Sequence, residues 1–227
     1  MSDAVRFPLV LGIITLCSAA GLAITYSATR RQIEFQQRLA RDRALAEALR
    51  LDIEPQELQD PEAPRPWEAF HYSGAGDGKA AQGFAVYQAT DPRTGQRLYA
   101  AQGEAQGYQS RIKVVAAVDQ SVEKGLQEAT IQAIKVVSQA ETPGLGNHCV
   151  DAWFQAQFRG LPVPMLEVDK TAQRRRPGAE GSDQQPVAAI TGATITSKAV
   201  AAATRQALQR IRRHVQSQKK SKQAPNM

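Results

Sequence analysis

Cysteine and histidine are scarce in this sequence, and their positions do not suggest a metal site. The 227 residues include two cysteines and three histidines. Cys17 lies in an apolar N-terminal run and Cys149 far downstream, so the paired spacing of zinc sites and the cysteine series of iron–sulfur clusters are both missing. The histidines are scattered at His71, His148 and His214. We therefore expect no metal ion and no disulfide between the two cysteines.

Nucleotide-binding and catalytic motifs are also missing. The chain has neither the Walker lysine spacing nor a GxGxxG turn, and no set of side chains suggests acid–base catalysis, so no catalytic residue is predicted. The net charge of +6 does not indicate nucleic-acid binding, because the basic residues gather in two places rather than over a reading face. These are the run Arg174–Arg176 and the C-terminal residues Arg210, Arg212, Arg213, Lys219, Lys220 and Lys222. A solvated surface, or contact with anionic lipid or an acidic partner, would explain both clusters.

Charge is absent over one long stretch, Phe7–Tyr26. About 20 apolar residues suffice for a helix to cross the ~30 Å hydrocarbon layer of a bilayer. A cleaved signal peptide is the competing interpretation, but it would have a basic N-terminus and a shorter apolar run. We predict a retained transmembrane helix within residues 1–29. The arginines after it (Arg30, Arg31, Arg38, Arg41 and Arg43) favour a cytoplasmic domain by charge counting, although large domains cross regardless of charge.

Beyond the membrane segment, the chain is predicted to form a stalk and then an α+β domain. Residues 30–50 have apolar side chains four apart and are predicted to be helical, whereas the prolines in 54–66 indicate a linker. We assign 30–66 to the stalk helix and linker, with an ordinary first helix of the domain as the alternative. The domain then covers 67–215, and a basic tail 216–227.

The domain alternates apolar and polar residues in four segments, which predicts an antiparallel sheet. These segments are 83–87, 96–101, 111–118 and 130–137. A helix is expected over about 150–158, and 170–186 is polar and predicted to be a loop. A long final helix is expected from near Ile195, with an apolar stripe formed by Val200, Thr204, Leu208, Ile211 and Val215.

Three threonines and a glycine stand directly before this final helix, in the sequence TGATIT at 191–196. A helix N-terminus has unpaired N–H groups and a positive dipole end, so it suits a phosphate. Gly192 allows close approach of the backbone, and Thr194 or Thr196 could cap the helix. A capped helix start without a ligand would have the same residues, so the local pattern alone leaves both interpretations open.

This segment resembles the flavinylation motif [Ser/Thr]-Gly-Ala-Thr-x-Thr of FMN-binding domains. These domains occur in the G subunit of the Rnf ion-translocating ferredoxin:NAD oxidoreductase and in the C subunit of the sodium-pumping NADH:quinone reductase. The resemblance implies that FMN is joined to Thr196 through a phosphoester, made from FAD by a separate flavin transferase. The protein would then position the flavin and tune its potential, while the flavin carries out the redox chemistry.

Three further segments resemble the same family and occur in its order. Residues 141–146 read ETPGLG, a loop that lies against the flavin in the family. Gly107-Tyr108-Gln109, followed by Ile112, resembles an element before a strand, and Trp153 with Phe158-Arg159-Gly160 resembles the segment after the loop. The implied flavin contacts are Thr191, Gly192, Ala193, Thr194, Glu141, Thr142, Gly144 and Leu145.

Two positions depart from the family pattern. Ala188 stands where the family usually has an aspartate shortly before the motif, and Asn147-His148-Cys149 replace the residues that usually follow the loop. A flavin transferase that reads the aspartate would modify this chain less efficiently. His148 is interpreted as a surface histidine and Cys149 as a small buried residue.

The resemblance implies an electron-transfer subunit that relays electrons between NADH and ferredoxin, coupled to Na⁺ or H⁺ translocation. Its partners would be other subunits of the complex, a flavin transferase and the lipid bilayer. The domain would lie on the periplasmic side of a bacterial inner membrane, contrary to the arginine count. The alternatives are a scaffold subunit without flavin, a basic-tailed adaptor, and the C subunit of a sodium-pumping quinone reductase.

Overall fold

The structure, a computed structural model of the full chain, describes residues 3–60, 62–72, 83–172 and 186–223. Its internal contacts divide the chain into two units, Met1–Ala40 and Arg41–Met227. The basic run Arg174–Arg176 and the last four residues of the tail lie outside the described residues.

The first unit is helical. Helix α1 spans Asp3–Ala48, and within the described residues it is the one helix long and apolar enough to cross a bilayer, with a mean hydropathy of 2.2 in its most apolar window. Its large apolar side chains have no protein partner: Leu16, Leu22 and Ile24 are all at least 71% exposed. Such a surface is unstable in water and stable in lipid. This helix is the single-pass membrane anchor.

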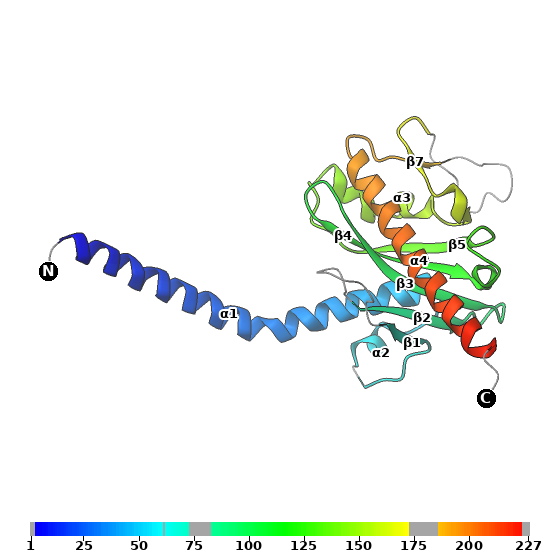
Figure 1. Cartoon of the computed structure of the whole chain (residues 1–227), viewed down its shortest axis with the longest axis horizontal. Coiled ribbons are helices and arrows are strands. Elements are labelled where there is room, and N and C mark those ends of the chain that lie inside the picture. Colours follow the sequence, from blue (N-terminus) through cyan, green and yellow to red (C-terminus); the bar gives the residue numbers. More distant parts are fainter. Residues whose placement is uncertain (1–2, 61, 73–82, 173–185, 224–227) are drawn as a thin grey trace. The chain divides into compact units, whose positions relative to one another are not determined.

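The second unit is built on a six-stranded antiparallel sheet in which each strand pairs with the next along the chain (Figure 1). The strands are β1 Glu68–Tyr72, β2 Phe84–Thr90, β3 Arg97–Gln106, β4 Arg111–Asp119, β5 Thr130–Ser138 and β6 Leu161–Pro162. The four predicted strand segments correspond to β2–β5, and the α+β class is confirmed. Tight turns join β2 to β3 and β3 to β4, because antiparallel neighbours need only a turn, whereas η2 (Gly146–Val150) and α3 (Ala152–Ala156) lie in the long connection between β5 and β6.

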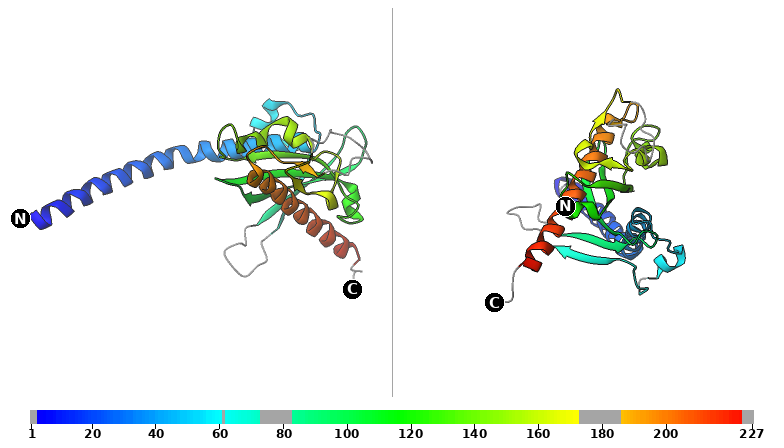
Figure 2. Two further views of the ribbon diagram at one scale, coloured as in Figure 1. Left: turned by 90° about the horizontal axis from the view of Figure 1, so that it is seen from above. Right: turned by 90° about the vertical axis from the view of Figure 1, so that its right-hand side faces the viewer.

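Helix α4 (Thr194–Gln223) crosses one face of the sheet and packs on β3 and β4 (Figures 1 and 2). The predicted apolar stripe is buried along its length, from Val200 to Val215. The helix approaches closest at Gly103, where a Cβ atom would lie 2.0 Å from the carbonyl oxygen of Ala203. The helix also continues through most of the expected tail, to Gln223.

The end of α1 covers the opposite face of the sheet (Figure 2). Leu45, Ala48 and Leu49 are fully buried. Val115 and Ala117 are also fully buried, and they alternate along β4 with the core residues Val114, Ala116 and Val118, so they lie on the sheet face away from α4. Polar contacts hold this segment: Lys135 pairs with Glu47, and Arg50 donates to Gln132 at 2.8 Å. The compact unit therefore begins at Arg41, inside the expected stalk rather than at Trp67, because the last turns of α1 supply a layer of the core.

Smaller elements account for the remaining differences from expectation. The helix expected over 150–158 is only α3, Ala152–Ala156, preceded by a 3₁₀ turn. Strand β1 was not expected. The remaining elements are α2 Pro55–Gln59, η1 Gln120–Glu123, η2 Gly146–Val150, η3 Val163–Met165, β7 Val168–Asp169 and β8 Val187–Ala188. Strands β7 and β8 form a short parallel pair that leads into the start of α4.

Candidate functional site

The loop before α4 folds back onto the first turn of the helix. Ser197 fastens it, because its hydroxyl accepts a bond from the backbone N–H of Ile190 at 2.9 Å and donates to the carbonyl of Ala193 at 3.0 Å. Gly192 has a φ of +75°, a conformation that favours glycine. Because α4 begins at Thr194, Thr196 lies in its first turn. The Thr196 hydroxyl faces the protein interior rather than capping the helix.

Thr196 meets a carboxylate there. Its Oγ donates to Oε2 of Glu141 at 2.6 Å, and both residues are buried, at 1% and 5% exposure. The β3–β4 turn supplies four more donors to the same carboxylate. They are the backbone N–H groups of Tyr108, Gln109 and Ser110 and the Ser110 hydroxyl, at 2.8–3.1 Å.

These donors keep Glu141 ionised despite its burial. Desolvation raises the pKa of the carboxyl group, but the hydrogen bonds from Thr196, Ser110 and Gln109 outweigh desolvation, so the pKa lies below its ordinary value of 4.5. A buried carboxylate with several donors is expected to behave in this way. The site therefore holds a fixed negative charge directly beside the Thr196 hydroxyl.

Two glycines leave the space in which this cluster forms. A Cβ atom at Gly107 would lie 2.6 Å from Oε1 of Glu141. A Cβ atom at Gly146 would lie 2.7 Å from Oγ of Thr196. The GYQ segment therefore packs directly against Glu141 of the ETPGLG loop, and this loop packs directly against Thr196 at the start of α4, with no space for a side chain at either glycine.

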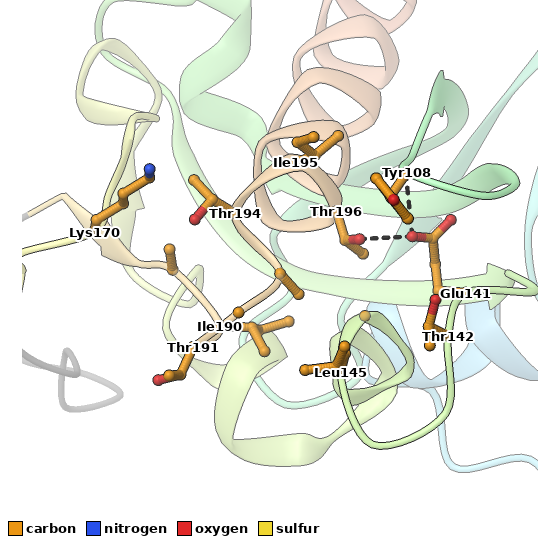
Figure 3. Close-up of a pocket in the computed structure, with 14 residues that line it drawn as sticks. Tyr108, Glu141, Thr142, Leu145, Lys170, Ile190, Thr191, Thr194, Ile195 and Thr196 are labelled. Carbon is orange, nitrogen blue, oxygen red and sulfur yellow. Dashed lines mark hydrogen bonds between the residues drawn. The ribbon is translucent and has the colours of Figure 1, made fainter.

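A cavity of about 710 Å³ opens over the cluster (Figure 3). This volume lies within the range of small-molecule and cofactor sites. The structure brings eight of the nine predicted site residues to its wall: Thr191, Gly192, Ala193, Thr194, Thr196, Glu141, Thr142 and Leu145. Gly144 is not among the lining residues; it forms the turn of the loop with a φ of +75°.

The cavity has both a polar and an apolar side. Tyr108, Leu145 and Ile195 line it and are 45–71% exposed, so large apolar side chains gather at its wall. Against them lie the threonine hydroxyls and the positive end of a 30-residue helix. Such a wall fits a ligand with a phosphate at one end and a flat, mostly apolar ring at the other, as FMN has.

Lys170 was missed by the sequence analysis, although it also lines the cavity. The β7–β8 pair places it there, because the backbone N–H of Ala189 donates to the carbonyl of Asp169 at 2.9 Å. A single lysine in a polar segment carries no sequence signal; only the pairing with β8 brings it beside Thr194 (Figure 3).

The two departures from the family pattern lie close to the site. Ala188 is 5% exposed, and its backbone N–H and carbonyl both bond to the Gln157 side chain. The aspartate usual at this position would thus be buried in the folded domain. Cys149 is fully buried, as expected, and burial raises the pKa of its thiol to about 11. The His148 side chain is 43% exposed and bonds to Asp151 at 2.8 Å.

Comparison with known families matches two regions of the chain. The FMN-binding domain family matches residues 107–209, and the RnfG N-terminal region matches residues 4–48. The first match includes every predicted site residue. The second covers α1 almost from end to end.

Curated relatives carry the same name across distant organisms. The G subunit of the ion-translocating oxidoreductase complex of Aliivibrio fischeri is 29% identical over 203 residues, covering 88% of this chain and 86% of the relative. The protein of the same name from Methanosarcina acetivorans is 28% identical, covering 83% and 84%. The G subunit of the proton-translocating ferredoxin:NAD(+) oxidoreductase complex of Clostridium ljungdahlii is 30% identical, covering 50% and 52%.

Solved structures share the fold. NqrC of Shewanella oneidensis aligns with a TM-score of 0.55 at 19% identity, covering 78% of this chain and 96% of that one. The C subunit of the Na(+)-translocating NADH-quinone reductase of Parabacteroides distasonis aligns with a TM-score of 0.56 at 21% identity, covering 79% and 92%.

Proposed function

Because the chain belongs to the family of G subunits of ion-translocating oxidoreductase complexes, we propose that it is a membrane-anchored electron-transfer subunit that carries FMN covalently on Thr196. The observation that carries the proposal is the cavity at the start of α4, where Thr196 lies between a fixed carboxylate and the helix N-terminus. Bound FMN supplies the electron transfer. The protein itself supplies binding, orientation and electrostatics.

In the proposed attachment, each part of the cavity wall has a role. The Thr196 oxygen would be one ester of a phosphodiester, and the remaining charge would rest on the N-terminal dipole of α4. Gly192 has no side chain to block the approach of a phosphate to the loop backbone. Tyr108, Leu145 and Ile195 provide the apolar surface against which an aromatic ring is stable in water.

The family membership also supports the setting. The relatives are named as subunits of multi-subunit complexes, which supports the other subunits as partners of this chain. A flavin transferase is the further partner that covalent attachment of FMN requires. We place the domain on the periplasmic side of a bacterial inner membrane, with α1 as the anchor. Coupling to Na⁺ or H⁺ movement and exchange between NADH and ferredoxin are part of the proposal. They are supported by the word ion-translocating in the Aliivibrio and Methanosarcina names and by the proton-translocating ferredoxin:NAD(+) oxidoreductase named for Clostridium, rather than by any residue described above.

A scaffold role without flavin is the second candidate, and Ala188 is the observation that favours it. If a transferase reads the usual aspartate, the present chain would remain unmodified. The RnfG N-terminal match argues against the third interpretation, the C subunit of a quinone reductase.

The function is tested by reducing the isolated complex. We expect anaerobic NADH to bleach flavin absorbance in a complex purified through this chain. The complex containing Thr196→Val should assemble with the same subunits and lose the fraction of the bleaching that belongs to this flavin. An assembled Thr196→Val complex with unchanged flavin content and unchanged electron flow would favour the scaffold role.

A further inference from the structure

Four hydroxyl residues lie within seven positions at the start of α4, yet they are not equivalent. Thr191 is exposed and Thr194 half-buried. The Ser197 hydroxyl has both a donor and an acceptor partner within the loop. Among the four, only the Thr196 hydroxyl bonds to an ionised side chain. A difference in chemical environment therefore distinguishes one oxygen from its neighbours.

The carboxylate that makes this difference is itself held rigidly. Oε1 of Glu141 accepts three bonds, from the Ser110 hydroxyl and the backbone N–H groups of Gln109 and Ser110. Oε2 accepts from Tyr108 N–H as well as from Thr196. The backbone N–H of Glu141 is bound in turn by the Gln139 side chain at 2.7 Å. With the Thr196 hydrogen directed at Oε2, the lone pairs of Thr196 Oγ point elsewhere, and Thr196 is at the cavity wall (Figure 3).

We propose that Glu141 is the positioning residue for flavinylation: it selects Thr196 among the four hydroxyls and orients its oxygen for attack. This inference rests on the proposed function. In the step, Thr196 Oγ forms a bond to the flavin-side phosphorus of an FAD donor, and the bond from that phosphorus to the AMP oxygen breaks. AMP leaves, and the hydroxyl proton passes along the Glu141 hydrogen bond to solvent. No electrons are transferred.

The lowered pKa of Glu141 agrees with a role in orienting the Thr196 hydroxyl rather than in retaining the proton that this hydroxyl loses. The same hydrogen bonds that hold the carboxylate lower its pKa, so Glu141 releases a proton readily near neutral pH. A charge-assisted hydrogen bond is about twice as strong as a neutral one, which favours a single rotamer of Thr196. The other titratable groups near the carboxylate are the Cys149 thiol, neutral because burial raises its pKa to about 11, and the Tyr108 side chain on the cavity wall. Lys170 lies at the opposite side of the cavity, beside Thr194 (Figure 3).

The test follows the initial rate of covalent flavin attachment to the full chain in detergent, with purified flavin transferase and FAD. Glu141→Gln keeps the size of the side chain and removes its charge. We expect it to slow attachment at least about tenfold, less than the roughly 10²–10⁴-fold of a general acid or base, because Glu141 orients the hydroxyl rather than storing its proton. Glu128→Gln is the matched control, since it makes the same substitution at an exposed carboxylate that pairs with Lys124, at the end of β4 away from the Tyr108–Ser110 turn. It should stay within about twofold of the unmodified sequence.

The pH dependence of the attachment rate distinguishes an effect of the Glu141 charge from an effect of loop order. The ratio of the unmodified rate to the Glu141→Gln rate cancels titrations of the transferase. It should be constant near neutral pH and fall towards one in acid, as Glu141 becomes protonated. Equal rates for Glu141→Gln and the unmodified chain would overturn the inference while leaving covalent FMN intact. A ratio that does not change with pH, or a Glu128→Gln rate as slow as that of Glu141→Gln, would also overturn it, in favour of a general effect on loop order or folding. No attachment to the unmodified chain would instead overturn the proposed function.

Discussion

At the scale of single residues, the site leaves no room for a side chain at Gly146. A Cβ atom would lie 2.7 Å from Thr196 Oγ and 2.9 Å from Glu141 Cβ. Overpacking of this kind typically costs about 1–3 kcal/mol. We expect Gly146→Ala to lower the free energy of unfolding by that amount and to reduce flavin attachment, measured by thermal unfolding and gel fluorescence.

Gly12→Ala is the control for Gly146→Ala, because its new methyl group would meet nothing within 4 Å apart from the neighbouring backbone of its own helix. It should change neither quantity. If Gly146→Ala behaved like this control, the close packing of the loop against Thr196 would be wrong.

The ionised Glu141 also predicts a dependence of stability on pH. Its pKa is lower in the folded state than the ordinary 4.5, so its contribution is fully present above pH 4.5 and is lost as the pH falls through the folded value. Before flavin attachment, Glu141→Gln should therefore be less stable at neutral pH, and the difference should shrink in acid. Tryptophan fluorescence melts of both proteins measure this.

Other carboxyl groups with lowered pKa values, such as Asp91 and Asp169, are present in both proteins and cancel in the difference. Stability curves that run parallel from neutral pH down into the acid range would show that Glu141 is not held as an anion.

At the scale of elements, local patterns predicted the parts that have clear periodicity. Strands β2–β5 and helix α4 follow from the alternation of apolar residues and from the stripe at three- and four-residue spacing. Strand β1, Glu68–Tyr72, was missed because it lies at the edge of the sheet and is only partly shielded, so its pattern is weak. The four-residue spacing of Leu45 and Leu49 predicted an apolar helix face. The surface that this face covers, the side of the sheet away from α4, consists of residues far away in the sequence and could not be identified from it.

Gly103 shows how one element constrains another. A methyl group there would lie 2.0 Å from the Ala203 carbonyl oxygen and 2.8 Å from the Ala207 nitrogen, both in the backbone of α4. Because a helix backbone cannot yield locally, we expect Gly103→Ala to destabilise the domain by about 3 kcal/mol, near the upper range for overpacking. Chemical denaturation of the full chain in detergent measures it.

Gln106→Ala, on the exposed end of the same strand, should change stability by no more than about 0.5 kcal/mol. An effect of Gly103→Ala as small as this would mean that α4 does not rest on β3 as described.

At the scale of the whole molecule, the sequence located the candidate site because its motifs belong to one family. Eight of nine predicted residues line one cavity. The hydrogen bond between Glu141 and Thr196 was not predictable, because it joins segments 55 residues apart in the sequence. The position of Lys170 was not predictable either, because it depends on the pairing of β7 with β8. The arginine count after α1 and the family setting predict opposite sides of the membrane.

Protease treatment of spheroplasts decides between these two sides. With a periplasmic domain, we expect added protease to cleave residues 49–227 in intact spheroplasts. Protection that ends only when the membrane is permeabilised would place the domain in the cytoplasm.

Covalent attachment of FMN to Thr196 is tested by one gel. The full chain is expressed with a flavin transferase, denatured, separated and viewed under ultraviolet light beside Thr196→Val and Thr194→Val. We predict a fluorescent band for the unmodified sequence and for Thr194→Val, and a dark band for Thr196→Val. A dark band for the unmodified sequence, with a known flavinylated protein bright on the same gel, would contradict the claim and favour the scaffold role.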